Sequence, residues 1–472
     1  MAGMKEPSSG LVPEGRLGIA TDLYQLTMAN GYCALGKEDE RATFDLFVRK
    51  LPSNRSYLVV AGLEQALHYL LNVSFTEEDI RFLKGKPVFR KAGKALWDRL
   101  RNFKFTGDAW AMPEGTIAFG GEPLLTIEAP LLEAQLVETY LLTCYNHQTK
   151  IASKAARCVE AARGRPIIEF GMRRTDIGAA LRAARAAFVG GAAGSSNVMA
   201  EALFGIPSYG THAHSWVMSF DTEEEAFKAY FQVYGKETVA LVDTYDTIRG
   251  AERAAHLPGP IRGIRLDSGD LLSLSREARA ILDAAGKKEG RIFATNDLNE
   301  YRITDLLAGG ARIDIFGVGT ELALSADAPS LGGVYKLAEL VRNGKRCPKL
   351  KLSKDKATSP GRKQVYRSYE AGMMDGDMVA LRGEYDGRTS PPSAINSRQA
   401  FIPLLVPVVR KGKLVYKLPS LVRIRERAIR GREALPERFR RNEADPSYHI
   451  SMSPGLHRLT EETIKGMGGG KK

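Results

Sequence analysis

The chain has 472 residues, 44% of them hydrophobic and 26% charged, which is ordinary for a folded protein and excludes wholesale disorder. The longest apolar stretch, residues 401–409, contains two prolines and is far shorter than the roughly 20 residues of a membrane helix. The formal net charge is +13, and the basic surplus is concentrated after residue 341. Nucleic acid, a membrane surface, acidic small molecules and a merely solvated face would each explain this charge, so charge alone assigns no function.

The four cysteines, at positions 33, 144, 158 and 347, never form a CxxC pair, which argues against a zinc ribbon or a disulfide framework. The first residues lack the apolar region of a secretory signal. Together these observations predict a cytoplasmic globular protein.

Residues 1–145 mix short β-rich stretches with helical ones. From about residue 146 the pattern becomes regular. An alanine-rich helix candidate precedes short apolar runs that begin near residues 167, 207, 238, 261, 291 and 313, with helical patterns between most of them. Repeated β–α units predict a parallel sheet, either open and doubly wound or closed into a barrel. The basic C-terminal part contains an arginine-rich helix candidate, residues 421–432, to which the sequence assigns no role.

Polar, turn-prone residues end each apolar run, for example at residues 169–174, 243–246 and 295–297. Parallel α/β folds build their sites at the carboxyl ends of the strands. Six polar ends in chain order suit a barrel better than an open sheet, whose site lies at a single switch point. We therefore expect a barrel with its site at these strand ends.

Two of these ends have features of phosphate-binding turns. Gly317-Val-Gly319-Thr320 follows an apolar run, and glycines let backbone N–H groups approach an oxyanion closely. Asn296 and Asp297 follow the preceding run in the same way. A tight strand–helix turn without a ligand is the alternative, and no GxxxxGK[ST] segment is present.

Arg265, Asp267 and Asp270 lie within six residues at another strand end. Residues 265 and 267 project to the same side of a regular strand. An arginine beside carboxylates suits a substrate with anionic groups and hydroxyls, such as a sugar phosphate. The alternative is an internal salt bridge with Asp270 as a helix N-cap.

The segment Gly210-Thr211-His212-Ala213-His214 contains two of the seven histidines. Histidine serves as a base, a metal ligand or a nucleophile. An HxH pair at a strand end also suggests a metal-dependent barrel hydrolase, but the histidines downstream, at positions 256, 449 and 457, do not fall at strand ends.

Together these segments resemble the nicotinate phosphoribosyltransferases. The resemblance runs through TDLYQLTMANGY (residues 21–32), ATFDLFVRKLP, EFGMRRT, GTHAHSW, LVDTYDT, IRLDSGDL, ATNDLNE, DIFGVGTEL and GRKQVYR (residues 361–367). It implies the ATP-coupled, ligase-class conversion of nicotinate and 5-phosphoribosyl 1-pyrophosphate to nicotinate mononucleotide and pyrophosphate, within NAD biosynthesis.

The resemblance also implies an architecture. It consists of an N-terminal α/β sandwich domain (residues 1–145), an irregular, TIM-like α/β barrel (residues 146–370) and a basic segment (residues 371–472) that returns to pack on the first domain. The implied assembly is a homodimer with shared active sites that binds neither nucleic acid nor a membrane.

The site residues that the resemblance implies fall into three groups. His214 matches the phosphorylated histidine, ATP is the co-substrate, and Asp267 is the second catalytic residue, matched to an acid that holds the ribose hydroxyls. The residues matched to nicotinate binding are Tyr24 (from the neighbouring subunit), Phe170, Arg173, Ser196, Thr211 and Arg265. Those matched to phosphoribosyl pyrophosphate are Asp270, Asn296, Asp297, Gly317, Gly319 and Thr320, and Mg²⁺ would accompany the pyrophosphate through Asp267 and Asp270.

Ser196 bears on the choice of pyridine. A serine can donate a hydrogen bond to a carboxylate, whereas the aspartate that nicotinamide-using relatives have at the matching place would repel it. The sequence therefore favours nicotinate over nicotinamide, which remains the alternative substrate.

Overall fold

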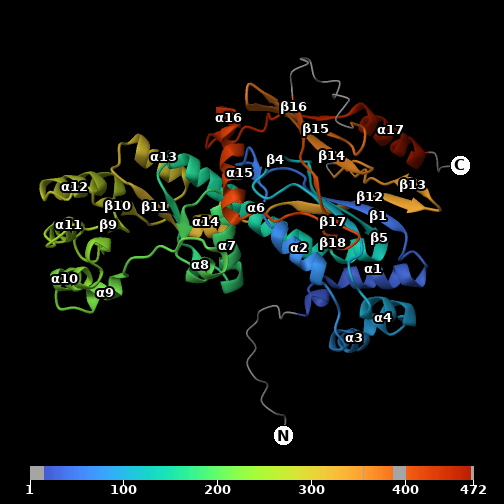
Figure 1. The fold of residues 1–472 in the computed structure, drawn as a ribbon, viewed down its shortest axis with the longest axis horizontal. Helices are drawn as coiled ribbons and strands as arrows, with labels where there is room; N and C mark the ends of the chain where they lie inside the picture. Colours follow the sequence, from blue (N-terminus) through green and yellow to red (C-terminus); the bar gives the residue numbers. More distant parts are fainter. Residues whose placement is uncertain (1–14, 354–355, 386–399, 469–472) are drawn as a thin grey trace, which may run out of the picture.

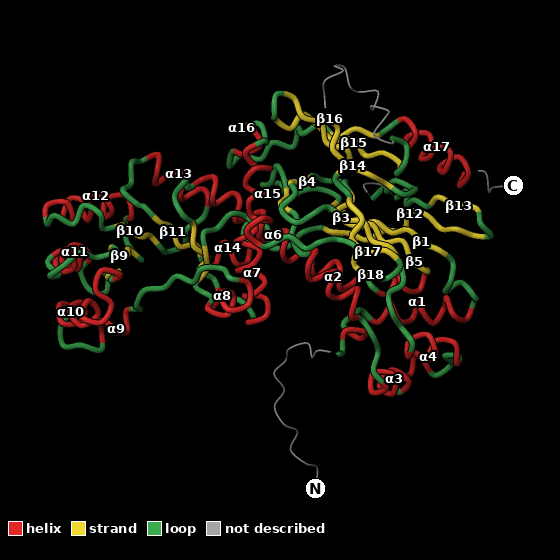
Figure 2. Tube along the Cα trace, in the orientation of Figure 1, coloured by secondary structure: helices red, strands yellow, loops and turns green. Residues whose placement is uncertain are grey.

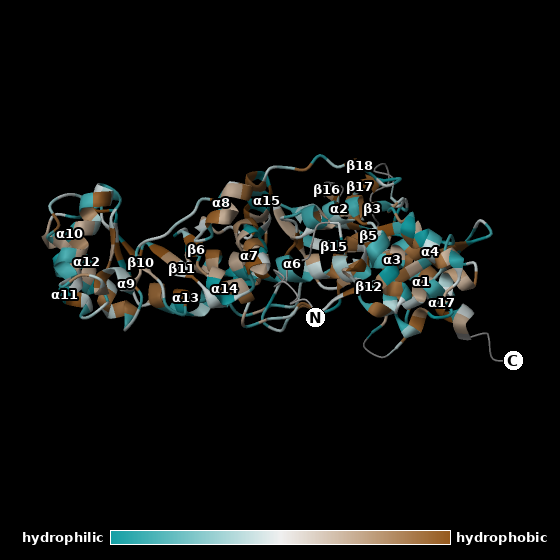
Figure 3. Cartoon of the chain, turned by 90° about the horizontal axis from the view of Figure 1, so that it is seen from below, coloured by the Kyte–Doolittle hydropathy of each residue, from teal (hydrophilic) through white to brown (hydrophobic). Residues whose placement is uncertain are grey.

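In the computed structural model of the chain, residues 15–353, 356–385 and 400–468 are described. Residues 1–14, from which we predicted that no secretory signal is present, lie outside the described residues. Figure 1 shows an elongated molecule with two lobes, and Figure 3 shows the same elongation from below. Helix α6 (Glu138–Ala161) runs between the lobes. No helix in the described ranges is long and apolar enough to cross a membrane.

The first lobe is built on an antiparallel seven-stranded sheet, in the order β13–β12–β1–β5–β3–β17–β18. The bounds of these strands are β1 Arg41–Val48, β3 Asp108–Ala111, β5 Pro123–Pro130, β12 Gly333–Arg342, β13 Lys345–Pro348, β17 Val406–Arg410 and β18 Lys413–Leu414. A two-stranded sheet pairs β2 (Leu58–Val59) with β4 (Ile117–Ala118). A four-stranded sheet has the order β16 (Ala400–Pro403), β14 (Lys363–Glu370), β15 (Met373–Leu381), β19 (Ile450–Met452). The helices of this lobe are α1 Leu23–Ala34, α2 Leu63–Asn72, α3 Glu77–Lys84, α4 Lys94–Arg101, α5 Leu131–Leu136 and α17 Pro454–Gly468.

The second lobe contains a parallel six-stranded sheet flanked by helices (Figure 2). Its strands are β6 Ile167–Glu169, β7 Gly194–Ser195, β8 Val239–Leu241, β9 Gly263–Leu266, β10 Arg291–Ala294 and β11 Ile315–Val318. Its helices are α7 Ile177–Val189, α8 Val198–Phe204, α9 His214–Met218, α10 Glu223–Tyr234, α11 Thr247–Ala255, α12 Leu271–Ala284, α13 Glu300–Ala308 and α14 Thr320–Leu324. The predicted α/β fold with a parallel sheet is confirmed.

The hydrogen-bonded sheet does not close into a barrel. Its order is β7–β6–β11–β10–β9–β8, so β11, the last of these six strands in the chain, pairs with β6, the first of them. Ser208 adds a single parallel bridge beside β7. Between Ser208 and β8 the described residues form no ladder. At this gap the Leu241 N–H instead donates to His212 Nε2 at 3.1 Å.

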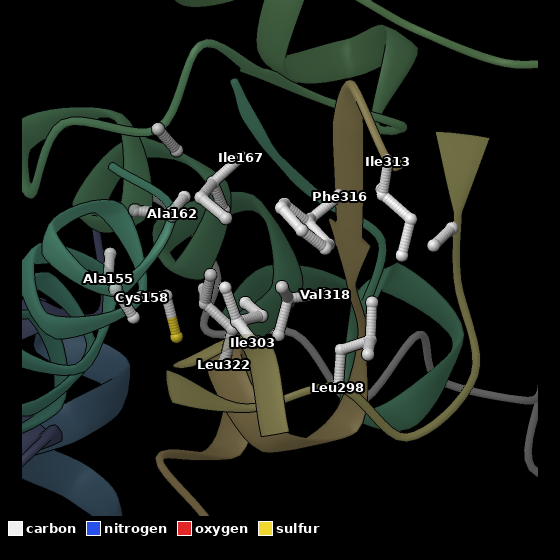
Figure 4. Close-up of a cluster of buried hydrophobic side chains, with 14 of the residues drawn as sticks. Ala155, Cys158, Ala162, Ile167, Leu298, Ile303, Ile313, Phe316, Val318 and Leu322 are labelled. Carbon is white, nitrogen blue, oxygen red and sulfur yellow. The ribbon is translucent and has the colours of Figure 1, made fainter. Parts of the chain in front are cut away.

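Apolar side chains from the sheet and its helices form the core of the second lobe (Figure 4). Ile167, Phe316 and Val318 come from the strands and pack against Leu322 of α14 and small residues of α6. Helix α7 ends directly against α6, where a Cβ on Gly190 would lie 2.3 Å from the Ala152 carbonyl oxygen. The small residues of α6 therefore let the neighbouring helix approach its backbone.

The C-terminal third of the chain returns to the first lobe. Strand β12 pairs with β1, and β17 pairs with β3, so the return starts at residue 333, before the boundary expected at residue 370. The division into residues 1–145, 146–370 and 371–472 stays a prediction.

The arginine-rich helix α15 (Leu421–Glu433) lies between the lobes, followed by α16 (Glu437–Arg440). Arg425 donates to the carbonyl oxygens of Gly191 and Ala192, at 2.9 and 3.0 Å. Arg427 donates to the carbonyl of Glu114 at 2.6 Å, and Arg432 pairs with Glu160 at 3.1 Å. These arginines join the lobes, which gives part of the basic surplus a structural role.

Candidate active site

A cavity of about 100 Å³ lies among the parallel strands and extends from residues at their carboxyl ends to Glu237 and Arg262, which precede β8 and β9. Its polar wall includes Thr211, Arg265 and Thr295, and the Phe170 ring and Gly317 contribute to the same wall. Four strand residues, Ile168, Val239, Phe293 and Ile315, form its apolar part. The cavity thus combines the Phe170 ring and other apolar side chains with the Arg265 cation, and Tyr209, Glu237 and Arg262 also line it.

Gly317 makes room for the aromatic ring. A Cβ at this position would lie 2.6 Å from both the Phe170 ring and Thr295 Cγ2. The Phe170 N–H donates to the Val318 carbonyl at 2.9 Å, so the backbone beside β6 is fixed to β11. Only glycine at residue 317 allows the ring to lie directly on the strand.

Arg265 is a partly buried cation that forms no ion pair within the described part of the chain. Its Nη1 donates to Thr211 Oγ1 at 2.6 Å, while its Nε is buried without a hydrogen-bond partner in the described part of the chain. No carboxylate of that part forms an ion pair with it, and burial lowers the pKa of its guanidinium. A desolvated, unpaired cation attracts an anionic ligand, such as a carboxylate or a phosphate.

His214, the first residue of α9, lies at the same end of the sheet. Its Nδ1 is 3.1 Å from Thr244 Oγ1, and its Nε2 is 3.7 Å from Asp267 Oδ2. The Thr295 hydroxyl donates to the other oxygen of Asp267, whose own N–H donates to Asp243 Oδ2 at 2.9 Å. The imidazole is 40% exposed, so one nitrogen is oriented while the other faces both a carboxylate and solvent.

His212 has a different role. Its side chain is buried against Tyr230, with ring centroids 4.7 Å apart, and its Nε2 accepts the Leu241 N–H. Burial lowers its pKa to about 4, so the ring is neutral near pH 7. Because this lone pair is already engaged, the two histidines do not form a metal-binding pair, and the described residues contain no cluster of three potential metal ligands.

The two phosphate-like turns follow β10 and β11. Asn296 and Asp297 both have positive φ angles, 89° and 46°, and the carbonyl of Asn296 accepts from Arg302 at 3.2 Å. Gly319 is the N-cap of α14, and Thr320 is its first residue. Since β10 pairs with β11, these turns are neighbours.

Asp270 is the N-cap of α12 and accepts from the Leu272 N–H at 3.2 Å. The predicted N-cap is therefore observed, whereas Arg265 forms no ion pair with Asp267 or Asp270. Its side chain also accepts from the Ser273 hydroxyl, and the residue remains exposed, so the capping role leaves the carboxylate accessible.

The remaining predicted residues lie further out. Arg173 is exposed in a short 3₁₀ turn after β6, and the Ser196 N–H beyond β7 donates to the Glu169 carbonyl at 2.9 Å. Both are at the same end of the sheet but outside the cavity wall. Tyr24 lies on α1 of the other lobe and is 47% exposed, so one chain does not bring it to the cavity.

Asp243, Thr244 and Thr295 position the site without having been assigned roles from the sequence. Their hydrogen bonds orient His214 and Asp267. Their position in the polar segments LVDTYDT and ATNDLNE, at two strand ends, was the sequence feature that could have indicated this role.

The first lobe has a cavity of its own, of about 260 Å³, between its larger sheets. Arg49 and Lys336 line it, and neither forms an ion pair with another described residue. The Arg49 Nε is buried and has no hydrogen-bond partner there. Asp45 and Lys363 pair across the wall at 2.8 Å. This cavity also has the charge to attract an anion.

The parallel sheet and its strand-end cluster define an α/β enzyme with a site for an anionic substrate. Three family profiles match the chain: the nicotinate phosphoribosyltransferase N-terminal domain at residues 19–146, the nicotinate phosphoribosyltransferase family at residues 166–380 and the nicotinate phosphoribosyltransferase C-terminal domain at residues 362–460. A nicotinate phosphoribosyltransferase of Mycobacterium tuberculosis is 43% identical, over 92% of this chain and 91% of its own length.

The corresponding protein of Bacillus subtilis is 39% identical, over 93% of both chains. Among solved structures, human nicotinic acid phosphoribosyltransferase superposes with a TM-score of 0.80 at 28% identity, covering 94% of this chain and 99% of the human one. The chain belongs to the nicotinate phosphoribosyltransferase family.

Proposed function

We propose that the protein joins nicotinate to 5-phosphoribosyl 1-pyrophosphate, giving nicotinate mononucleotide and pyrophosphate, with coupled hydrolysis of ATP. The observation that carries the proposal is the unpaired Arg265 guanidinium in one cavity with the Phe170 ring, lined also by Thr295, which donates to Asp267 beside His214. A flat ring with a carboxylate matches this combination of an aromatic face and a partly buried cation.

The strand ends supply the other contacts that the reaction needs. The 5′-phosphate would bind at Gly317, Gly319 and Thr320 together with the neighbouring turn of Asn296 and Asp297. The ribose would lie between these turns and Asp267, where a carboxylate stabilises positive charge that develops on the ring as pyrophosphate leaves. The pyridine nitrogen is itself the nucleophile, so no strong base is required.

Mg²⁺ fits the donors present. Asp267 and Asp270 offer accessible carboxylate oxygens, the ligands that this ion prefers. Bound with the substrate, the ion would neutralise the charge of the leaving pyrophosphate.

His214 is proposed to take the phosphoryl group from ATP. Its Nδ1 is 3.1 Å from the Thr244 hydroxyl, its Nε2 is 3.7 Å from Asp267, and the side chain is 40% exposed. Transient phosphorylation adds negative charge at the rim and couples ATP hydrolysis to substrate binding and product release.

Two exposed apolar patches support a dimer with shared sites. One is on α8, directly after Ser196, with Val198, Met199 and Leu203 at 70%, 48% and 62% exposure. The other, on α1, contains Leu23 and Tyr24, at 48% and 47% exposure. They belong to opposite lobes, so a two-fold pairing would place the Tyr24 patch of one copy against the Ser196 end of the other.

Three finer statements belong to the same proposal. The parallel strands form an irregular α/β barrel that is open between Ser208 and β8. From β8 to β11, and on from β6 to β7, each strand pairs with the next one in the chain, and β11 pairs with β6, as in a barrel. Arg173 and Ser196 assist the nicotinate carboxylate from outside the cavity wall. The enzyme acts on small molecules in the cytoplasm.

A coupled assay tests the function. The full chain is supplied with nicotinate, phosphoribosyl pyrophosphate, Mg²⁺ and ATP, and nicotinate mononucleotide, pyrophosphate and ADP are followed together. We expect all three products, with little turnover of nicotinamide or quinolinate run in parallel. Preference for either of those substrates would contradict the proposal.

Labelled ATP tests the phosphohistidine. Incubation with Mg²⁺ should give an acid-labile phosphate on the protein, and His214→Ala should abolish it. A label that survives this substitution places the phosphate elsewhere.

A further inference from the structure

A buried cluster of charged side chains connects the two phosphate-like turns to the rest of the molecule. Its members are three cations and three carboxylates: Arg55, Lys154, Arg157, Glu300, Glu321 and Asp327. None of them lines the cavity beside Phe170. The equal number of opposite charges lets the cluster remain ionised inside the fold.

Lys154 of α6 is at the centre of this cluster. Its side chain is fully buried, and its Nζ lies 2.6 Å from Glu300 Oε2 and 2.9 Å from Asp327 Oδ1. Glu321 Oε2 is 3.4 Å away. One ammonium group therefore contacts three carboxylates that come from three separate segments of the chain.

Two of these carboxylates begin the helices that follow the turns. Glu300 is the first residue of α13, shortly after the Asn296–Asp297 turn with its positive φ angles. Glu321 directly follows Thr320 at the start of α14. The position of Lys154 on the central helix α6 thus ties the starts of both helices to one rigid element.

The other cations complete the attachment. Arg157, one turn further along α6, donates to Glu300 Oε1 at 2.8 Å. Arg55, from the first lobe, holds Asp327 with two hydrogen bonds of 2.7 and 2.9 Å. Paired, bidentate contacts of this kind fix orientation as well as charge. The phosphate-like turns are thereby held in register with each other and with the first lobe.

We infer that Lys154 is a positioning residue for the phosphoribosyl substrate, and that it acts on the phosphate through Glu300 and Glu321 without touching it. The inference rests on the proposed function. Phosphate binding by backbone N–H groups depends on their mutual placement, because a displacement of about 1 Å weakens several hydrogen bonds at once. A cluster that served only stability would affect all substrates alike.

The test compares the change in KM for phosphoribosyl pyrophosphate with the change in KM for nicotinate. In Lys154→Met, we expect KM for phosphoribosyl pyrophosphate to rise about tenfold while KM for nicotinate changes less than about twofold. Arg185→Met is the matched control, since the Arg185 side chain is also buried, at 6% exposure, and pairs with Glu64 and Glu114, which do not adjoin a phosphate turn. It should lower the melting temperature and leave both constants near their wild-type values.

Glu321→Gln provides a second variant if Lys154→Met fails to fold. Glu321 is 29% exposed, and the amide removes only its charge. We expect a rise of about threefold in KM for phosphoribosyl pyrophosphate alone. Unchanged constants, or equal rises in both, overturn the inference. Wild-type enzyme is assayed first, so inactivity with nicotinate and phosphoribosyl pyrophosphate would instead refute the proposed function.

Discussion

His212 and His214 are separated by one residue and have opposite surroundings. His212 is buried against Tyr230 and accepts a backbone N–H, whereas the His214 ring reaches the rim beside Asp267. The neutral ring of His212 bridges the gap in the parallel sheet and fixes the segment that presents His214. The family resemblance selected His214 from the sequence, and the different burial of the two rings gives the physical reason.

The low pKa of His212 predicts an acid-sensitive fold. In the unfolded chain the pKa of a histidine is near 6.5, whereas burial lowers the pKa of His212 in the folded chain to about 4. Protonation is therefore easier in the unfolded chain. The unfolded state binds more protons between these values, so stability falls as pH decreases from about 6.5 to about 4, on the order of 3 kcal/mol in total.

His212→Gln should reduce this pH dependence, because glutamine can accept the Leu241 N–H without titrating. The measurement is the free energy of unfolding in urea between pH 4 and pH 7. The exposed His68 supplies a control, as His68→Gln should retain the wild-type slope. A variant at residue 212 with an unaltered slope would show that its burial does not control acid stability.

Ser196 is expected to read the substrate carboxylate. Ser196→Asp places a negative charge beside it, so kcat/KM should fall at least about tenfold for nicotinate and far less for nicotinamide. Steady-state kinetics with both pyridines measures the ratio. Equal losses for the two substrates would remove Ser196 from substrate discrimination.

At the scale of elements, strand β11 combines a core face with a binding turn. Phe316 and Val318 pack into the core, while Gly317 between them faces Phe170. Alternation along the strand explains why the same four residues serve both the core and the cavity.

Gly317→Ala should displace the Phe170 ring. The added Cβ would lie 2.6 Å from that ring, so we expect a stability loss of about 1–3 kcal/mol from overpacking and a rise in KM for nicotinate. Thermal unfolding and steady-state kinetics check the two effects. Gly332→Ala is the control, since a methyl group added there would have no neighbouring atom within 4 Å. An unchanged KM for nicotinate would mean that the ring does not bind the pyridine.

Local pattern predicted most of the parallel strands. The apolar runs near residues 167, 238, 261, 291 and 313 became β6, β8, β9, β10 and β11. The run near residue 207 forms only the bridge at Ser208, since Pro207 has no N–H to donate and contributes its carbonyl to Ser195 instead. This missing strand is where the sheet stays open.

Contacts between distant segments could not be predicted in the same way. The pairing of β12 with β1 joins residues about 300 positions apart, and nothing in either local pattern specifies the partner. The roles of Lys154 and Arg425 likewise depend on carbonyls and carboxylates that only the folded chain brings near. Family motifs located the strand-end residues, whereas their hydrogen-bond partners required the structure.

At the scale of the whole molecule, the separation of Tyr24 from the cavity decides how many chains form a site. Tyr24 lies on α1, in the lobe opposite Phe170 and His214. If a neighbouring copy completes the site, Tyr24→Ala and His214→Ala affect different halves of it. A mixed dimer of the two variants would then have one fully intact site and one doubly impaired site.

Co-expression with two affinity tags allows that mixed dimer to be purified. Each variant alone should be strongly impaired, and the mixed dimer should recover about half of the wild-type activity, because one of its two sites is intact. The pair His214→Ala with Asp267→Ala is the matched control. Both residues lie on the same lobe, 3.7 Å apart, so every site in that mixed dimer keeps one defect and no activity returns. Failure of the first pair to recover activity would place Tyr24 outside the partner's site, whereas recovery in both pairs would show that His214 and Asp267 of one chain do not serve the same site.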